Sequence, residues 1–221
     1  MVMSAILNLF KPLKLVGLLR SYYYSSQIDN GDGKILFANP LQKIKLIKRK
    51  GAKLLISGRL FIQPHMKFDG PVLIYIGKNA TLKIGGDFAI GQNTKIMVGP
   101  QAILQIGGKK NGSGSGITSD SFIMVNKSIT IGHDFICAWN VFISDSDWHK
   151  IEGQNHQSDV IIGDKVWIAN NVNVLKGTRI GSGSIVASNT KVINKEYPER
   201  VLISGPQGKV VRENVNWTQS I

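Results

Sequence analysis

The sequence predicts an all-β solenoid, a parallel β-helix with three-sided coils. Three observations carry this prediction. Aliphatic residues recur at every sixth position in the C-terminal half, small or β-branched residues follow four positions later, and glycine or alanine often comes directly after the aliphatic residue. An α-helix repeats its apolar face about every 3.6 residues and a strand about every two, so a period of six requires another geometry.

The period is strict from Ile162 onward. The aliphatic positions are Ile162, Ile168, Val174, Ile180, Val186 and Val192, and the small or β-branched positions are Val166, Val172, Thr178, Ser184 and Thr190. Each hexad supplies one flat side of a triangle, with the aliphatic side chain inside and a small residue where the backbone turns. Three hexads complete a coil, which stacks on the next one at a strand spacing of about 4.8 Å.

The same phase appears earlier in the chain, at Ile84, Ile90, Ile96, Ile131, Cys137 and Ile143. Cys137 therefore takes an inward position, and we expect it to pack as a small apolar residue and not to act as a nucleophile. Looser repeats occupy residues 51–58, 77–86 and 99–108. These segments predict irregular N-terminal coils of the same solenoid.

These patterns divide the chain into three parts. We expect an N-terminal appendage over residues 1–34, the β-helix over 35–203 and a C-terminal tail over 204–221. The phase is lost near 109–116, which is rich in glycine and serine, and again near 149–160. Both segments are expected to be excursions on the surface of the solenoid.

The appendage has a pattern of its own. Apolar residues at helical spacing predict a short helix, although Pro12 weakens this prediction; they are Ile6, Leu9, Phe10, Leu13 and Val16. A helix that caps the solenoid with this stripe is the first interpretation. A basic helix that rests on an anionic membrane surface is the alternative.

Composition narrows the class of protein. The 221 residues are 43% hydrophobic, enough for a substantial core, and carry a formal net charge of +13, which favours anionic partners. Low aromatic content and the lack of a nucleic-acid-binding motif argue against nucleic acid. The sequence predicts neither a membrane span nor a signal peptide, and its single cysteine requires no oxidising compartment, so we expect a cytoplasmic protein.

A strongly basic stretch follows the appendage. Basic and aliphatic residues alternate there, which predicts a strand with one charged face; the basic residues are Lys43, Lys45, Lys48, Arg49, Lys50 and Lys53. A solvated edge is one interpretation of this face. Recruitment to an acidic glycan or to an anionic membrane is the other.

The stretch from Ile162 to Ser184, together with the tail segment Ser204–Arg212, resembles the hexapeptide-repeat acetyltransferases. The resemblance is specific from about residue 129 to 212 and closest to the sugar O-acetyltransferases of capsule and lipopolysaccharide assembly. It implies a left-handed parallel β-helix and direct transfer of acetyl from acetyl-CoA to a sugar or polysaccharide hydroxyl. It also implies a homotrimer with its groove between subunits, and no metal.

The resemblance places the general base at His149, in the segment Asp145-Ser-Asp-Trp-His149. An imidazole with a pKa near about 6.5 can take a hydroxyl proton at neutral pH. In an extended segment Asp145, Asp147 and His149 point to one side, so either aspartate is a candidate to orient the imidazole. His156, in the following loop, is a candidate for contact with the acceptor.

On the donor side, the resemblance assigns the pantetheine arm to Trp167, Asn170, Ala187 and Ser188, and the CoA phosphates to Lys209 and Arg212. The phase turns Trp167 outward, where it either borders the groove or packs against another subunit. Asn170 or a backbone N–H is the candidate for stabilising the oxyanion. Lys and Arg donate several hydrogen bonds to phosphate oxygens, and a solvated basic tail is the alternative.

Other functions stay open on the sequence alone. An aminosugar or antibiotic N/O-acetyltransferase would share the repeat and the donor site. A scaffold without catalysis would also keep the six-residue period. A zinc carbonic anhydrase would need three converging histidines, and His133, His149 and His156 do not have a recognised metal-binding spacing.

Overall fold

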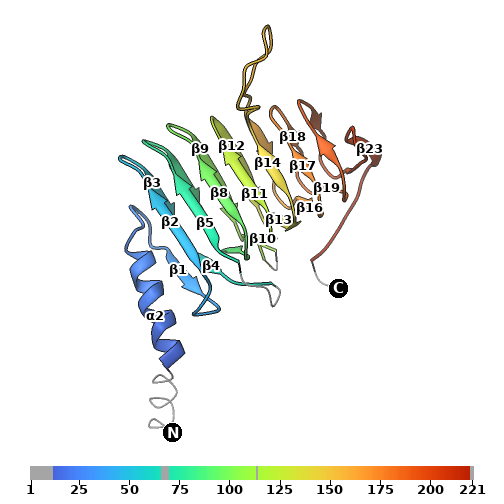
Figure 1. Ribbon diagram of the computed structural model, residues 1–221. Coiled ribbons are helices and arrows are strands. Elements are labelled where there is room, and N and C mark those ends of the chain that lie inside the picture. The colour runs from blue at the N-terminus through green and yellow to red at the C-terminus, as the bar shows by residue number, and fades with distance from the viewer. Residues whose placement is uncertain (1–11, 66–69, 113, 220–221) are drawn as a thin grey trace.

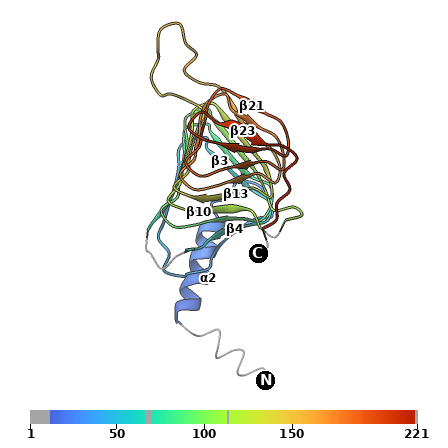
Figure 2. The same ribbon diagram turned by 90° about the vertical axis from the view of Figure 1, so that its right-hand side faces the viewer.

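The computed structural model describes residues 12–65, 70–112 and 114–219. Its chain winds into a triangular solenoid in which every third strand returns to the same side (Figures 1 and 2). The coils stack through parallel pairing, and the last pair, β22 with β23, is antiparallel. The predicted three-sided parallel β-helix is confirmed.

Each side of the triangle is one sheet, named here by its first strand. Sheet 1 contains β1 (Lys34–Phe37), β4 (Arg59–Ile62), β7 (Phe88–Ile90), β10 (Gly116–Ser119), β13 (Ile136–Trp139), β16 (Trp167–Ile168), β19 (Ile185–Val186), β22 (Leu202–Ser204) and β23 (Lys209–Arg212). Sheet 2 contains β2 (Ile44–Lys48), β5 (Val72–Ile76), β8 (Lys95–Val98), β11 (Phe122–Val125), β14 (Phe142–Ser144), β17 (Asn173–Val174) and β20 (Lys191–Val192). Sheet 3 contains β3 (Lys53–Ile56), β6 (Thr81–Ile84), β9 (Ile103–Gly108), β12 (Ser128–His133), β15 (Val160–Ile162), β18 (Arg179–Ile180) and β21 (Glu196–Tyr197).

The strict repeat forms the narrow C-terminal coils. All its aliphatic and small positions are buried. Ile162 pairs with Ile180, and Ile168 pairs with Val186, eighteen positions later in each case. From β16 to β20 each strand has two residues and sends one side chain inward, so three strands with their turns fill the coil and the period of six is kept.

The N-terminal coils are wider. Leu54 and Ile56 both point inward from β3, and they pair with Leu82 and Ile84 of β6. Strands that bury two side chains each need more residues per coil, and the turns between them differ in length. This is why the sequence shows only a loose repeat in this half, although its inward residues pack into the same continuous core.

A ladder of asparagines forms the corner between sheets 1 and 2. Asn140, Asn171 and Asn189 occupy the same place in successive coils, with φ angles of 57°, 58° and 59°. Asparagine tolerates this left-handed conformation better than most residues. Each side chain also donates a hydrogen bond to the next, at 2.7 Å and 3.1 Å. The corner therefore holds the adjoining positions Trp139, Asn170 and Ser188 in register.

Cys137 lies inside the coil, as predicted, with 1% of its surface exposed. Burial raises the pKa of its thiol to about 12. The reactive thiolate is therefore scarce near neutral pH, and a thiol reagent has no path to the sulfur. We expect the native protein not to react with Ellman's reagent at about pH 8, and the protein unfolded in guanidinium to react fully. A fast reaction of the native protein would contradict the inward placement.

Helix α2 (Pro12–Ser25) lies beside β1 at the N-terminal end of the solenoid (Figure 1). The expected apolar stripe does not pack against the coils: Leu13 is 54% and Val16 39% exposed, so this part of the capping interpretation is wrong. Ile6, Leu9 and Phe10 lie outside the described residues. The helix contacts the first coil through other residues, among them Gly17 and Arg20.

Candidate functional site

The segment between β14 and β15 leaves the solenoid as a long loop at the corner between sheets 2 and 3. It projects beyond the coils in both views of the chain (Figures 1 and 2). Its base is closed by an antiparallel bridge between Ser146 and Gln157 and by a hydrogen bond from Asp147 N to the His156 carbonyl at 2.8 Å. The loop therefore carries His149 away from the coil surface on a closed, two-stranded stem.

Asp145 anchors this loop from inside. Its carboxylate is fully buried and accepts three backbone N–H groups of the preceding coil: Oδ1 from Asn126 at 2.7 Å, and Oδ2 from Lys127 at 2.8 Å and Ser128 at 2.7 Å. Hydrogen bonds to a buried carboxylate are among the stronger ones in proteins. Asp145 thus fixes the place where the loop leaves the coil.

Asp147 and His149 lie on the exposed part of the loop. The Asp147 carboxylate forms an ion pair with Lys176, whose Nζ also donates to the Asn155 carbonyl at 2.6 Å. The His149 side chain is exposed and makes no hydrogen bond to another described residue. Neither aspartate is bonded to it within the single described chain. The catalytic roles of Asp145, Asp147 and His149 stay predictions.

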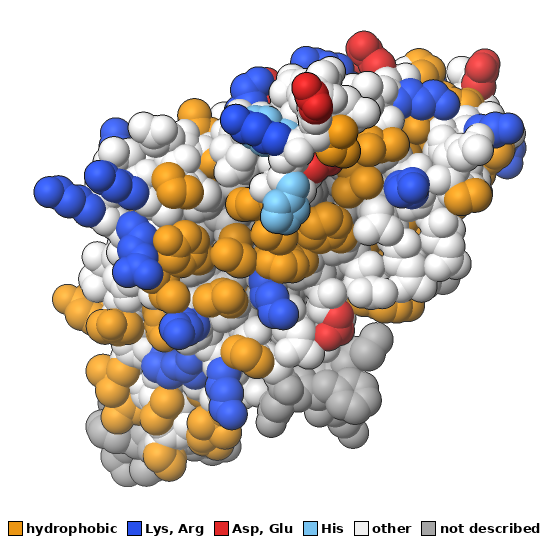
Figure 3. Space-filling view, turned by 45° about the horizontal axis from the view of Figure 1, so that its top comes forward, with side chains coloured by type: hydrophobic (Ala, Val, Ile, Leu, Met, Phe, Trp, Pro, Cys, Tyr) orange, Lys and Arg blue, Asp and Glu red, His pale blue; other side chains and the backbone are white. Residues whose placement is uncertain are grey.

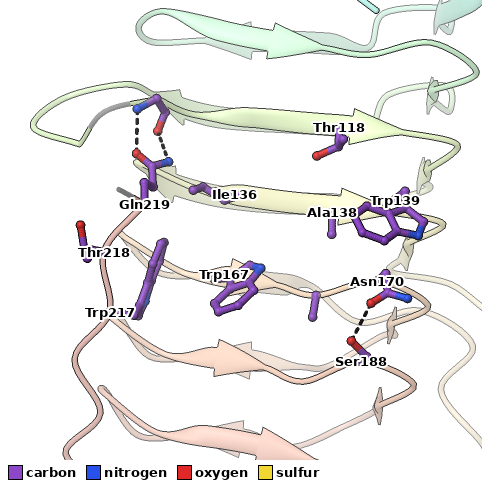
Figure 4. A pocket seen from close by; sticks show the side chains of 12 residues that line it. Thr118, Ile136, Ala138, Trp139, Trp167, Asn170, Ser188, Trp217, Thr218 and Gln219 are labelled. Atoms are coloured by element: carbon purple, nitrogen blue, oxygen red, sulfur yellow. Dashed lines mark hydrogen bonds between the residues drawn. The ribbon is translucent and has the colours of Figure 1, made fainter. Parts of the chain in front are cut away.

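A groove of about 600 Å³ runs over the outer face of sheet 1. Three of the four tryptophans line it, together with small and polar side chains (Figure 4). The lining includes Thr118, Trp139, Trp167, Asn170, Ser188 and Trp217. Of the residues predicted for the donor, Trp167, Asn170 and Ser188 therefore lie together in one groove. Ala187 follows Val186 on the adjoining strand.

The groove has a polar edge beside the asparagine corner. The Ser188 hydroxyl donates to Asn170 Oδ1 at 2.6 Å (Figure 4). This bond leaves the Asn170 Nδ2 group without a partner among the described residues, so it is available to a ligand oxygen. The groove is also lined by the small side chains of Ala138 and Ala169. Ala187, the remaining residue predicted for the donor, is not among the residues that line the groove, and its N–H is bonded to the Ile203 carbonyl at 2.8 Å.

The C-terminal tail completes the groove, which the sequence pattern did not indicate. Trp217 packs against Trp167 with ring centroids 5.9 Å apart (Figure 4). Its Nε1 atom is buried and has no hydrogen-bond partner among the described residues. Gln219 ties the tail to Gly114 by two hydrogen bonds, one at 2.8 Å and one at 2.9 Å. The one large aromatic residue of the tail was the signal that the sequence offered for this contact.

The basic residues of the tail are aligned with the groove. β23 adds to the end of sheet 1, where Arg212 pairs with Leu202 and Lys209 with Ser204. Leu202 pairs with Ile185, which in turn pairs with Trp167. Arg212 therefore lies in the same column as Trp167, three strands away, or about 14 Å at the usual spacing. Both basic residues of β23 are exposed.

The predicted base is not part of this groove. The groove lies on sheet 1 and ends at the corner between sheets 1 and 2, whereas the loop leaves at the corner between sheets 2 and 3. Within one chain, the whole width of sheet 2 separates them. The described residues contain no group of three or more His, Cys, Asp or Glu side chains placed to hold a metal ion.

Comparison with known proteins identifies the repeat. The profile "Bacterial transferase hexapeptide (six repeats)" matches residues 159–194. The chain is 26% identical over 152 residues to a polysialic acid O-acetyltransferase of Escherichia coli O1:K1 / APEC, covering 66% of this chain and 45% of that protein. It is 33% identical over 101 residues to the putative lipopolysaccharide biosynthesis O-acetyl transferase WbbJ of E. coli K12, covering 39% of this chain and 51% of that one. The matches thus span about half the length of these relatives.

A solved structure, that of the polySia-specific acetyltransferase NeuO, has a similar fold. It aligns with a TM-score of 0.51 at 23% identity, over 87% of this chain and 88% of that one. The likeness extends through the N-terminal coils, beyond the residues that match the repeat profile. Together, the repeat profile, the relatives and the stacked parallel coils show that residues 159–194 carry the bacterial transferase hexapeptide repeat and that the chain has a left-handed parallel β-helix fold.

Proposed function

We propose that this protein is an acetyltransferase that moves the acetyl group of acetyl-CoA to a hydroxyl of a sugar or polysaccharide. The observation that carries the proposal is the groove on sheet 1. Aromatic and amide groups line the groove, and the exposed Arg212 lies in the column of Trp167 three strands away, with Lys209 on the same strand as Arg212. Acetyl-CoA is a long molecule with a thioester at one end and phosphates at the other, so its functional groups match this arrangement of side chains.

The residues present fit such a donor. The small side chains of Ala138 and Ala169 leave space for a narrow pantetheine arm, and Asn170 Nδ2, which has no partner among the described residues, suits its amide or thioester oxygens. Lys209 and Arg212 would hold the phosphates. Acetyl-CoA supplies the activated acyl group; binding, orientation and proton transfer are left to the protein.

In the proposed reaction, His149 takes the proton of the acceptor hydroxyl, whose oxygen attacks the thioester carbonyl. Asn170 or a backbone N–H stabilises the oxyanion. The C–S bond then breaks, and the protonated imidazole returns its proton to the departing thiolate. No acyl-enzyme is formed, because the two substrates are held side by side.

This reaction requires His149 to lie beside the groove. Within one chain, however, the width of sheet 2 separates the two. We therefore propose that the site forms between chains of a homotrimer, with His149 of one chain facing the groove of its neighbour. The outer face of sheet 2 supports such packing because it carries half-buried apolar side chains in adjacent columns; they are Leu73, Tyr75, Met97, Phe122, Met124 and Phe142. Apolar patches of this kind are typical of subunit contacts.

We base the proposed acceptor on the two relatives, the polysialic acid O-acetyltransferase and the putative lipopolysaccharide biosynthesis O-acetyl transferase WbbJ. A test would supply acetyl-CoA labelled in the acetyl group, with capsular and lipopolysaccharide glycans and with amino sugars, and would measure CoA release and the product bond. We expect a base-labile O-acetyl ester on a glycan. An acetamide on an amino acceptor would favour the N-acetyltransferase alternative. No CoA release with any acceptor would favour a scaffold.

Trp217 provides a separate test of the donor site. If its indole lines the pantetheine arm, Trp217→Ala removes aromatic contact area, and we expect the Kd for CoA to rise roughly tenfold. Calorimetric titration of the purified protein with CoA measures this Kd. Ile193→Ala, a change at an exposed residue elsewhere on the coils, should leave the Kd unchanged. An unaltered Kd for the Trp217 variant would remove the tail from the donor site.

A further inference from the structure

Helix α2 is oriented against the usual rule for a surface helix. The residues that face the coils are small or polar: Gly17 is buried against Pro40, and the Arg20 guanidinium donates to the carbonyls of Pro40 and Gln42, the latter at 2.6 Å. One turn later, the Tyr24 hydroxyl donates to the Ile44 carbonyl at 3.2 Å. The helix is thus held to the first coil by hydrogen bonds, by the Gly17 contact and by Phe37, against which Tyr24 packs with ring centroids 5.4 Å apart.

The opposite face of the helix is apolar and open to solvent. At helical spacing, the side chains pointing away from Gly17 are Leu15, Leu19, Tyr22 and Tyr23, and Leu18 lies at the edge of this face, beside a pocket between the helix and sheet 1. The exposed fractions of these five side chains are between 48% and 79%. A protein surface rarely leaves a continuous patch of large apolar side chains uncovered unless it is a site of interaction. The described part of the chain does not cover it.

The charge around this face indicates what covers it. Residues 1–28 contain Lys11, Lys14 and Arg20 and no acidic residue. The exposed Lys43 and Lys45 follow the segment to which the helix is bonded. In Figure 3, hydrophobic side chains at the lower left lie beside a cluster of Lys and Arg side chains. A second copy of this face would bring like charges together, whereas an anionic bilayer complements both the charge and the apolar side chains.

We propose that α2 is an interfacial anchor that binds the surface of a membrane rich in anionic phospholipid, with Leu15, Leu18, Leu19 and Tyr22 entering the boundary between headgroups and acyl chains. The lysines around the helix contact the phosphates. None of the described helical residues forms a segment long and apolar enough to cross a bilayer. Membrane binding rests on the helix face and the cations around it, and so does not depend on the transferase activity proposed above.

The test is sedimentation of the whole chain with vesicles of phosphatidylcholine alone or mixed with phosphatidylglycerol, at low and high salt. We expect binding to the anionic vesicles that weakens with salt. The double variant Leu18→Gln with Leu19→Gln should lower the vesicle affinity at least about tenfold, since two leucines no longer enter the bilayer. Lys43→Gln with Lys45→Gln should lower it less and reduce its salt dependence.

Ile103→Gln is the matched control, because Ile103 is 48% exposed but lies on sheet 3, and it should bind as the wild type does. Circular dichroism checks that each variant keeps its fold. The proposal is overturned if the wild type does not bind anionic vesicles, or if the leucine variant binds them equally well. It is also overturned if that variant changes only the oligomeric mass in light scattering, because the face would then be a contact between copies of this chain.

Discussion

Replacing His149 by alanine should reduce the rate of acetyl transfer by about 10²–10⁴, the usual contribution of a general base. The reason is chemical, since a neutral sugar hydroxyl attacks a thioester slowly unless its proton is removed as the new bond forms. The Kd for CoA should not change, because His149 is proposed to act on the acceptor hydroxyl and is not among the residues that line the donor groove. The rate and the Kd are measured on the same preparation, by CoA release and by calorimetry.

His156→Ala is the control for this experiment. Both histidines belong to the loop that leaves sheet 2, and His156 is part of its closed stem through its backbone carbonyl, which alanine preserves. Because His156 is a candidate for contact with the acceptor and not for proton transfer, we expect its loss to raise the KM for the acceptor and to leave kcat near the wild-type value. A His149 variant that transfers acetyl at the wild-type rate would remove it from the mechanism.

The second large effect is expected on stability. Asp145→Asn keeps the size of the side chain but turns an amide NH₂ toward backbone N–H groups that now bond to a carboxylate. Each buried donor left without an acceptor costs about 1–3 kcal/mol, so we expect a loss of about 3 kcal/mol. For a chain of this size that corresponds to a fall in Tm of about 6–12 °C, measured by calorimetry.

Asp147→Asn makes the same chemical change two residues later, at an ion pair on the exposed part of the loop. Such pairs contribute less than about 1 kcal/mol, so the Tm should fall by no more than a few degrees. Equal effects of the two substitutions would show that Asp145 is not the anchor of the loop.

The period of six was sufficient to predict the fold because it is a local consequence of coil geometry. A short strand that buries one aliphatic residue, as at Ile168 and Val186, is compatible with few folds other than a three-sided coil. The N-terminal coils were predicted only loosely, since β3 and β6 bury two side chains each and their turns vary in length. The outward position of Trp167 and the inward position of Cys137 followed directly from the phase.

The site was harder to predict, for two physical reasons. The prediction that Asp145 and His149 share a side assumed an extended segment, but Trp148 has a φ of 64°, which breaks the alternation just before the histidine. Trp217 lies in a tail without periodicity, so its contact with Trp167 depends on how the chain returns across sheet 1. A site built between chains would, in addition, leave no pattern within one sequence.

The most direct test of the central claim mixes two inactive variants. Subunits with His149→Ala and subunits with Trp167→Ala are co-expressed with different tags, and mixed assemblies carrying both tags are purified and assayed for CoA release in the presence of a glycan acceptor. If each site joins the loop of one chain to the groove of the next, a mixed trimer contains one intact site and should recover about one third of the wild-type activity. If the mixed assemblies are as inactive as the two parents, the site is not shared between chains and this account is contradicted.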